Sequence, residues 1–174
     1  MDQYKRYLTS LDPSGKSIIT PDTSLYLRPL ANGTVARAYA LSSIPANITN
    51  DTDLRAFRST DTAQNEASYA GLDTALPNGV VMTYFELGPG AETVLHRTLS
   101  VDFSILIEGK LEMILDGGEK VQLKVGDSVI QRATMHKWRN LSKDKPVRLI
   151  GILCACKPVN IGGRLMQEEW VEGS

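Results

Sequence analysis

The chain has 174 residues with 19 basic and 20 acidic side chains, which gives a formal net charge of -1. This length gives room for one domain whose core is large enough to fold without disulfides or a structural metal. The near-balance of charge, without a long run of either sign, argues against nucleic-acid and anionic-membrane binders, so we expect a small-molecule partner.

The first 30 residues alternate short apolar pieces with turn sequences, which predicts a β-rich N-terminal arm. Asp12-Pro13-Ser14-Gly15 reads as a turn, and residues 17–20 read as a short strand. Residues 34–41 follow the turn pair Asn32-Gly33 and are a further candidate strand.

The location of the protein is predicted from three features of the sequence. The N-terminus lacks the apolar stretch of a signal peptide, and no run is long and apolar enough to span a bilayer. Cys154 and Cys156 lie two residues apart in an apolar strand pattern, a separation that strains a disulfide. We therefore expect a cytoplasmic protein with free thiols and no membrane partner.

Residues 46–78 are rich in Asn, Asp, Thr, Ala and Ser and have weak periodicity. The polar run at residues 50–53, followed by Leu54 and Phe57, predicts one short capped helix. A connection this long is uncommon in a compact domain and is typical of a segment that covers a binding site. A surface excursion is the alternative.

From residue 79 onward the chain reads as strand after strand, with tight turns and almost no helical periodicity. The expected strands are residues 80–87, 101–107, 110–115, 120–125, 128–131, 134–139 and 147–156. This pattern predicts an all-β fold with a small antiparallel barrel. We expect one structural domain with an arm and connecting segment over 1–78, a barrel core over 79–165 and a tail over 166–174. The tail either adds a strand or lies along the outside.

The two histidines of the chain, His96 and His136, lie at the two ends of this strand-rich module, and Thr98 and Asp102 follow the first one closely. Their placement predicts a shared site. A neutral imidazole can remove or return a proton, and a carboxylate within reach fixes its tautomer. The alternative is that both histidines are satisfied polar residues of the barrel wall.

The same residues resemble the two motifs of the cupin superfamily. The first motif is a glycine, His-x-His, a glutamate and a second glycine at fixed spacing, and here the corresponding positions are Gly90, His96, Thr98, Asp102 and Gly109. The second motif is matched at Gly126, His136 and Asn140, but it is one residue short and has neither its proline nor its glycine. The resemblance implies a cupin double-stranded β-helix, or jelly-roll barrel. It also implies a homodimer, because many cupins dimerise through their N-terminal strands and the arm before residue 42 suits such an exchange. The segments HRTLSVDF and GDSVIQRATMHKWRN also resemble those of single-domain cupins of fungal and bacterial specialised metabolism.

The metal site of the cupin family uses three histidines and a glutamate, and this sequence departs from that set. Thr98 stands in place of the second histidine and Asp102 in place of the glutamate. His96, Asp102 and His136 remain as a two-histidine, one-carboxylate set for Fe, Zn, Ni or Mn. Since aspartate reaches one methylene less than glutamate, we expect either no cofactor or a single, weakly bound divalent metal.

Strand parity extends the candidate site to neighbouring residues. If Asp102 points inward, Ser104 and Leu106 do too, and if His136 points inward, so does Trp138. Met82 and Tyr84, or their odd-numbered neighbours, are expected to line the opposite wall with Met113. Such a lining suits a flat, partly aromatic molecule. Ordinary barrel core is the alternative for Met113, Trp138 and Tyr84.

The resemblance and the site residues together predict a small-molecule enzyme of polyketide-like or aromatic metabolism that dehydrates, decarboxylates, isomerises or cyclises its substrate. His96 and His136 are the expected acid/base pair, Asp102 orients them and Thr98 hydrogen-bonds the substrate. One alternative is a metal-dependent cupin oxygenase or metallolyase that uses His96, Asp102 and His136. Another is a non-catalytic ligand-binding cupin.

Overall fold

The computed structural model describes residues 4–22 and 24–174, and most of its regular structure is β-strand. The elements of the N-terminal half are β1 (Thr9–Leu11), β2 (Ser17–Ile19), β3 (Arg28–Leu30), β4 (Gly33–Leu41), the 3-10 helix η1 (Thr49–Asp51), α1 (Thr52–Arg58) and β5 (Val80–Leu87). The remaining elements are β6 (Leu95–Arg97), β7 (Ser100–Glu108), β8 (Leu111–Leu115), β9 (Lys120–Leu123), β10 (Ser128–Arg132), β11 (His136–Asn140), β12 (Val147–Ala155), β13 (Asn160–Ile161), β14 (Arg164–Leu165) and β15 (Glu169–Val171).

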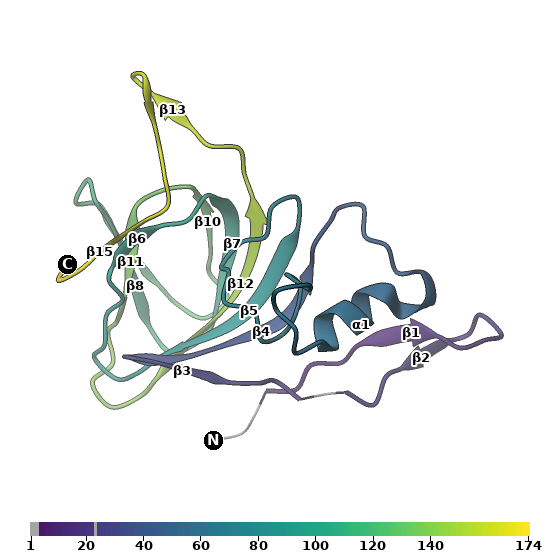
Figure 1. Cartoon of the computed structure of the whole chain (residues 1–174). Coiled ribbons are helices and arrows are strands. Elements are labelled where there is room, and N and C mark those ends of the chain that lie inside the picture. Colours follow the sequence, from purple (N-terminus) through teal and green to yellow (C-terminus); the bar gives the residue numbers. More distant parts are fainter. Residues whose placement is uncertain (1–3, 23) are drawn as a thin grey trace.

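Two antiparallel sheets face each other and form a jelly roll (Figure 1). The larger sheet has the strand order β10-β7-β12-β5-β4-β3, and the smaller one has the order β15-β6-β11-β8-β9. The sheets share no strand among the described residues, so the fold is two facing sheets rather than one closed barrel. The predicted all-β jelly-roll class is confirmed.

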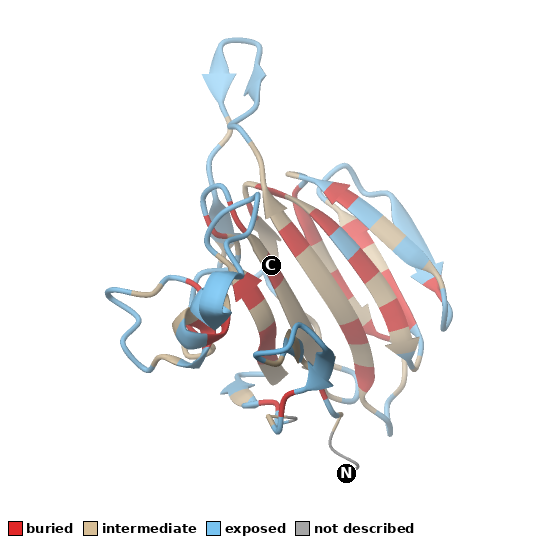
Figure 2. Cartoon of the chain, turned by 90° about the vertical axis from the view of Figure 1, so that its right-hand side faces the viewer, coloured by how far each residue is buried: buried red, intermediate tan, exposed pale blue. Residues whose placement is uncertain are grey.

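The interior of the jelly roll is apolar at one end and polar at the other. On β7 the residues with even numbers are buried, and they run from Ser100 and Asp102 to Leu106. On β11 the inward positions are His136, Trp138 and Asn140. The apolar end is a cluster formed by Leu87, Leu106, Leu111, Leu123, Trp138, Val147 and Leu149. Buried positions recur along the facing strands in Figure 2, as expected for sheets that bury one face.

The N-terminal arm covers the outer face of β4 and β5, as Figure 1 shows. Tyr4 stacks on Tyr84 with ring centroids 5.2 Å apart, and Leu25 packs with Ala36 and Ala38. The short strands β1 and β2 form a separate hairpin next to α1. The predicted β-rich arm is therefore present. Because it packs on the outer face, the larger sheet is covered on both faces.

The predicted short helix is α1, which buries Leu54 and Phe57 against the sheet side of the molecule. Its predicted side-chain cap is wrong, because Asp51 at the N-cap makes no capping hydrogen bond. The chain then returns over one end of the jelly roll, where Ala67 and Leu76 pack against β4 and β5. No helix in the described part of the chain has the length and apolarity needed to cross a membrane.

The C-terminal residues divide into a projecting hairpin and a strand of the smaller sheet. The hairpin β13–β14 stands away from the jelly roll at the top of Figure 1, and all of its strand residues are exposed (Figure 2). Beyond it, β15 pairs with β6 and completes the smaller sheet. Of the two alternatives for the tail, an added strand is the observed one. Cys154 and Cys156 are free thiols, as predicted.

Candidate active site

The centre of the candidate site is a pair of histidines on neighbouring strands of the smaller sheet. His96 on β6 and His136 on β11 are register partners in an antiparallel ladder. Directly paired residues share a face of the sheet, so both side chains point into the jelly roll. Their ring centroids lie 4.2 Å apart and the ring planes are inclined by 54°. The sequence prediction that the two imidazoles converge in one site is confirmed by this geometry.

The tautomer of each histidine follows from a hydrogen bond to its own strand. Nδ1 of His96 lies 2.8 Å from the carbonyl oxygen of Val94, and Nδ1 of His136 lies 2.9 Å from that of Thr134. A carbonyl oxygen can only accept, so each Nδ1 carries the hydrogen. Each neutral ring therefore keeps a lone pair on Nε2, and no described residue donates a hydrogen bond to either Nε2.

Burial keeps both imidazoles neutral at neutral pH. Burial lowers the pKa of His96, although the carbonyl of Val94 acts in the opposite direction. Burial also lowers the pKa of His136, and the adjacent His96 adds to that effect, so that it falls to about 4. Because the two rings are so close, protonation of one disfavours protonation of the other. The pair is therefore built to hold one additional proton.

Asp102 lies on the facing sheet, in a small cluster of hydroxyl groups. Its Oδ2 accepts a long hydrogen bond of 3.4 Å from Thr98 Oγ1, which in turn accepts one of 2.8 Å from Ser100 Oγ. Its Oδ1 is buried and has no hydrogen-bond partner, and burial raises the pKa of this carboxyl group. The predicted role of Asp102 as the orienter of an imidazole is wrong, because the backbone carbonyls of Val94 and Thr134 fix the rings.

The predicted metal-ligand set does not assemble. Within residues 4–22 and 24–174, no three His, Cys, Asp or Glu side chains are grouped so that they could hold a metal ion. His96 and His136 are neighbours on the smaller sheet, but Asp102 is short and extends from β7 of the larger sheet. The residues present therefore do not form the two-histidine, one-carboxylate site that remained from the four ligands of the family motif.

The histidine pair opens into a cavity of about 380 Å³ between the two sheets. Six of the ten predicted site residues line it, namely His96, Thr98, Asp102, Ser104, His136 and Trp138. The alternation of β7 and β11 explains this agreement, because inward positions are two residues apart. The roles that we predict for these six side chains remain predictions.

Four predicted lining residues lie elsewhere. Leu106 belongs to the apolar cluster and Met113 packs against it, so both form the core at the other end of the jelly roll. Met82 and Tyr84 pack against Leu25 on the outer face of the larger sheet, under the arm. For β5 the prediction of even-numbered residues is wrong, and the alternative that we considered, their odd-numbered neighbours, is the observed one.

The larger sheet and the chain segments beside it supply further lining residues. On the inner face of the larger sheet, Thr83 and Phe85 of β5 line the cavity with Val35 and Arg37 of β4. Arg28 of β3, residues 71–74 of the long connection and Trp170 of β15 also lie on the wall. Of these segments, the sequence indicated a site only for the connection and, as an alternative, for the odd-numbered residues of β5. Trp170 is the register partner of His96, a pairing that no local pattern indicates.

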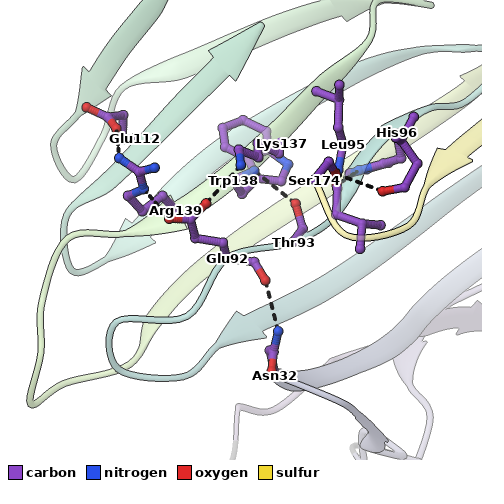
Figure 3. A network of polar contacts seen from close by, with 12 residues as sticks. Asn32, Glu92, Thr93, Leu95, His96, Glu112, Lys137, Trp138, Arg139 and Ser174 are labelled. Carbon is purple, nitrogen blue, oxygen red and sulfur yellow. Dashed lines mark hydrogen bonds and ion pairs between the residues drawn. The ribbon is translucent and has the colours of Figure 1, made fainter. Parts of the chain in front are cut away.

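The strand that carries His96 is fixed on both sides, as Figure 3 shows. The backbone N–H of Trp138 donates to Thr93 Oγ1 over 2.9 Å, just before β6 begins. The backbone N–H of Leu95 donates to Ser174 Oγ over 2.6 Å, which holds the chain end beside the histidine. The short strand β6 is thus positioned by β11 on one side and by the C-terminal residues on the other.

The remaining motif residues have structural roles. Asn140 is buried, and its Nδ2 donates to the carbonyl oxygens of Leu87, Gly88 and Lys145, which holds three chain segments together at the end of β11. Gly109 has a φ of +88°, and a Cβ there would lie 3.1 Å from the carbonyl oxygen of Pro146. The motif therefore preserves the frame of the jelly roll even where its metal ligands are replaced.

Comparison with known proteins identifies the family of this chain. A family model of the cupin domain matches residues 83–154. Oryzines biosynthesis cluster protein J from Aspergillus oryzae is 40% identical over 131 residues, which cover 75% of this chain and 69% of that protein. The cupin-domain-containing oxidoreductase srdB from Neurospora crassa is 32% identical over 162 residues, which cover 91% and 77%. The polyketide cyclase RemF from Streptomyces resistomycificus aligns with a TM-score of 0.42 and 20% identity, over 55% of this chain and 62% of that one.

The match to the family model and the cupin relatives of 30% identity or more define the class of protein. The chain belongs to the cupin superfamily. Within it, the relatives above include proteins of fungal biosynthesis clusters.

Proposed function

We propose that this cupin is an enzyme of specialised metabolism that moves a proton on a small organic substrate by acid/base catalysis. The observation that carries the proposal is the pair of neutral imidazoles whose Nε2 lone pairs are both free on the cavity wall. A general base needs an accessible lone pair within reach of the substrate, and imidazole is the side chain used most often.

His96 is the better candidate for the base of this pair. Its pKa is lowered by burial alone, whereas that of His136 is depressed to about 4 by burial and by His96 together. A base whose pKa lies nearer to the working pH transfers a proton more effectively. After His96 Nε2 takes the proton, the neutral His136 beside it offers a lone pair that accepts a hydrogen bond from the imidazolium.

The same proton can be returned to a different atom of the substrate. Return to another carbon gives an isomerisation, and return to a leaving hydroxyl gives a dehydration. Attack of the resulting carbanion on a carbonyl of the same molecule gives a cyclisation. The walls of Trp138, Phe85 and Leu149 surround the substrate with apolar surface, which strengthens polar interactions inside the cavity and limits access of water.

An oxidoreductase is a second candidate, because a relative that is 32% identical is named a cupin-domain-containing oxidoreductase. Such a reaction needs an electron acceptor in addition to a base. The two Nε2 atoms could each bind a metal ion, but the described residues supply no third metal ligand beside them. The proposed proton abstraction would be common to both candidates.

The test uses His96→Gln and His136→Gln, with Glu119→Gln in an exposed turn as the matched control. Purified protein is incubated in D₂O with metabolite extract from a strain that lacks its gene, and mass spectrometry follows conversion and deuterium uptake. We expect each histidine variant to slow conversion about 10²- to 10⁴-fold and the control to remain unchanged. Full turnover by both histidine variants would exclude the proposal.

Elemental analysis and oxygen consumption separate the two candidates. Turnover by metal-free protein without consumption of oxygen or another oxidant supports the acid/base enzyme. Stoichiometric metal together with oxidant-dependent turnover supports the oxidoreductase. Binding of a metabolite with no conversion at all would instead indicate a ligand-binding cupin.

A further inference from the structure

Two arginines line the cavity without a carboxylate partner. Arg28 of β3 and Arg37 of β4 are both on its wall, on the larger sheet. Neither forms an ion pair with a described residue. The arginines that do form such ion pairs are Arg6, Arg58, Arg97, Arg139 and Arg148.

Arg37 is buried, and most of its donors hold the long connection in place. Its Nη1 donates to the carbonyl oxygens of Glu66 and Ser68, each over 2.7 Å, and its Nη2 donates to that of Asp73 over 2.5 Å. The contact is so close that a Cβ on Gly71 would lie 2.2 Å from Nη1. These neutral carbonyls satisfy the hydrogen bonds of the guanidinium but leave its full charge beside the cavity.

Arg28 is half-buried and has donors left over. Its one hydrogen bond runs from Nη1 to the carbonyl oxygen of Gly71 over 3.2 Å, so its Nε and Nη2 are free of described partners. Nε and Nη2 are the pair of donors that a guanidinium presents side by side to a carboxylate. Arg28 therefore has the pair of donors that recognises a carboxylate. Its register partner on β4 is Val35, and Arg37 follows Val35 by two residues on the same strand.

The rest of the cavity wall offers little to balance these two charges. Both histidines are neutral at neutral pH because burial lowers the pKa of each, and Asp102 forms no ion pair with either arginine. Burial lowers the pKa of Arg37, the carboxylate of Asp73 at the exposed rim offsets this only in part, and the nearby Arg28 lowers it further. A buried charge is costly unless it is paired, so the two guanidiniums favour an anion in the cavity.

We propose that the ligand of this cavity is a small organic carboxylate, which Arg28 binds through its free fork while Arg37 supplies a second positive charge. The apolar body of the ligand lies against Phe85 and Trp138 and reaches the histidine pair on the facing sheet. This proposal rests on the proposed function and names its substrate class. It also links substrate binding to the connection over the cavity, because the same two arginines hold the carbonyl groups of residues 66, 68, 71 and 73.

The test compares two probes of equal shape, benzoate and its neutral analogue benzamide, by NMR titration of the full chain. The chain has two tryptophans, Trp138 and Trp170, and both line the cavity, so their indole N–H signals report occupancy directly. We expect benzoate to bind at least about 10-fold more tightly than benzamide. Equal binding of the two probes, or no binding of benzoate, overturns the proposal without any variant.

Variants then assign the selectivity to Arg28. Arg28→Gln is expected to weaken benzoate binding about 10-fold and to leave benzamide unchanged. Arg132→Gln, at an exposed position of β10 outside the cavity, is the matched control and should bind both probes like the original protein. Unchanged benzoate binding by a folded Arg28→Gln variant counts against the assignment.

The same titration distinguishes failure of this proposal from failure of the acid/base proposal. His96→Gln and His136→Gln remove the proposed base but leave the arginine fork, so both should still prefer benzoate. Selective benzoate binding with unaffected turnover in the histidine variants would reject the catalytic role alone. Loss of turnover in those variants, with no benzoate preference in the original protein, would reject the carboxylate ligand alone.

Discussion

His96 and His136 face each other across the β6–β11 ladder, with ring centroids 4.2 Å apart, although 39 residues lie between them in the chain. Each ring is fixed by the carbonyl two residues before it on its own strand. The pair therefore needs no other side chain to set its tautomers, and its Nε2 atoms are left for the cavity.

The first prediction concerns the pH dependence of turnover. The base must be neutral, and the pKa of His96 lies below its usual value because of burial. We expect kcat/KM to be constant at neutral and alkaline pH and to fall only as the pH drops below about 6.5. A pH–rate profile measures this directly. A profile that falls toward alkaline pH instead would contradict a neutral imidazole base.

The second prediction concerns stability in acid. The pKa of His136 is about 4 in the folded chain, below its usual value of 6.5, so the unfolded state binds a proton that the folded state does not. Its contribution is fully present above pH 6.5 and is lost as the pH falls from about 6.5 to about 4, by at most about 3 kcal/mol. Urea unfolding of His136→Gln should show a flatter dependence over this interval. Parallel curves for the two proteins would disprove it.

The third prediction is that Asp102→Asn stabilises the protein at neutral pH. Its Oδ1 has no partner, and burial raises the pKa of the carboxyl, so the charged form is disfavoured in the folded state. The cost is present above the raised pKa and disappears as the pH falls below the unfolded value. We expect a gain of about 1 kcal/mol in the free energy of unfolding at pH 8, and none at pH 3. Asp116→Asn, in an exposed turn, should show no such gain.

The fourth prediction concerns the shortened second motif. Ala133 joins β10 to β11 with a φ of +52°, a left-handed conformation that glycine adopts more easily. Ala133 also stands at the position of the motif's glycine when the missing residue is placed before the proline. Ala133→Gly should therefore raise the free energy of unfolding by about 0.5 to 1 kcal/mol in thermal or urea denaturation. Ala155→Gly, in the extended strand β12, should instead lower it.

The fifth prediction is the homodimer, which we propose to form through the N-terminal hairpin. A hairpin of two three-residue strands is marginal by itself, yet β1–β2 leaves Leu11 and Ile19 62% and 66% exposed. Light scattering should give twice the mass of one chain, and Ile19→Glu should shift the protein to monomers. Ile161→Glu, at a similarly exposed position of the projecting hairpin, is the control. A monomeric original protein would contradict the prediction.

The strands of the jelly roll followed from the sequence because their signals are local, and the shared site of the two histidines followed from their positions in the cupin motifs. Turn residues divide the chain from residue 79 onward into short strands, and alternation on β7 places Asp102 and Ser104 on one face. The spacing from Gly90 to Gly109 and the interval from His136 to Asn140 match the cupin motifs. Their prediction needed only the two-residue alternation of strands and the spacing of the motifs.

The parity of β5 could not be settled in the same way. Its sequence VVMTYFEL is apolar on both faces, because the arm covers the outer face while the cavity lies on the inner one. A bulge in β4 between Arg37 and Tyr39 also changes which residues face inward along that strand. Neither feature leaves a sign in the local pattern, and the choice of Met82 and Tyr84 was wrong for this reason.

The sequence by itself determined the strand pattern and the turns, since these depend on neighbours within a few residues, and the spacing of the cupin motifs identified the two imidazoles of the site. The tertiary structure decided which distant groups meet at the cavity: Arg28 and Arg37 opposite the histidines, Trp170 beside His96, and Asp102 apart from both rings. Such meetings depend on the register of strands and on the packing of two sheets. Those are set by the burial of the whole chain, so no short stretch of residues encodes them.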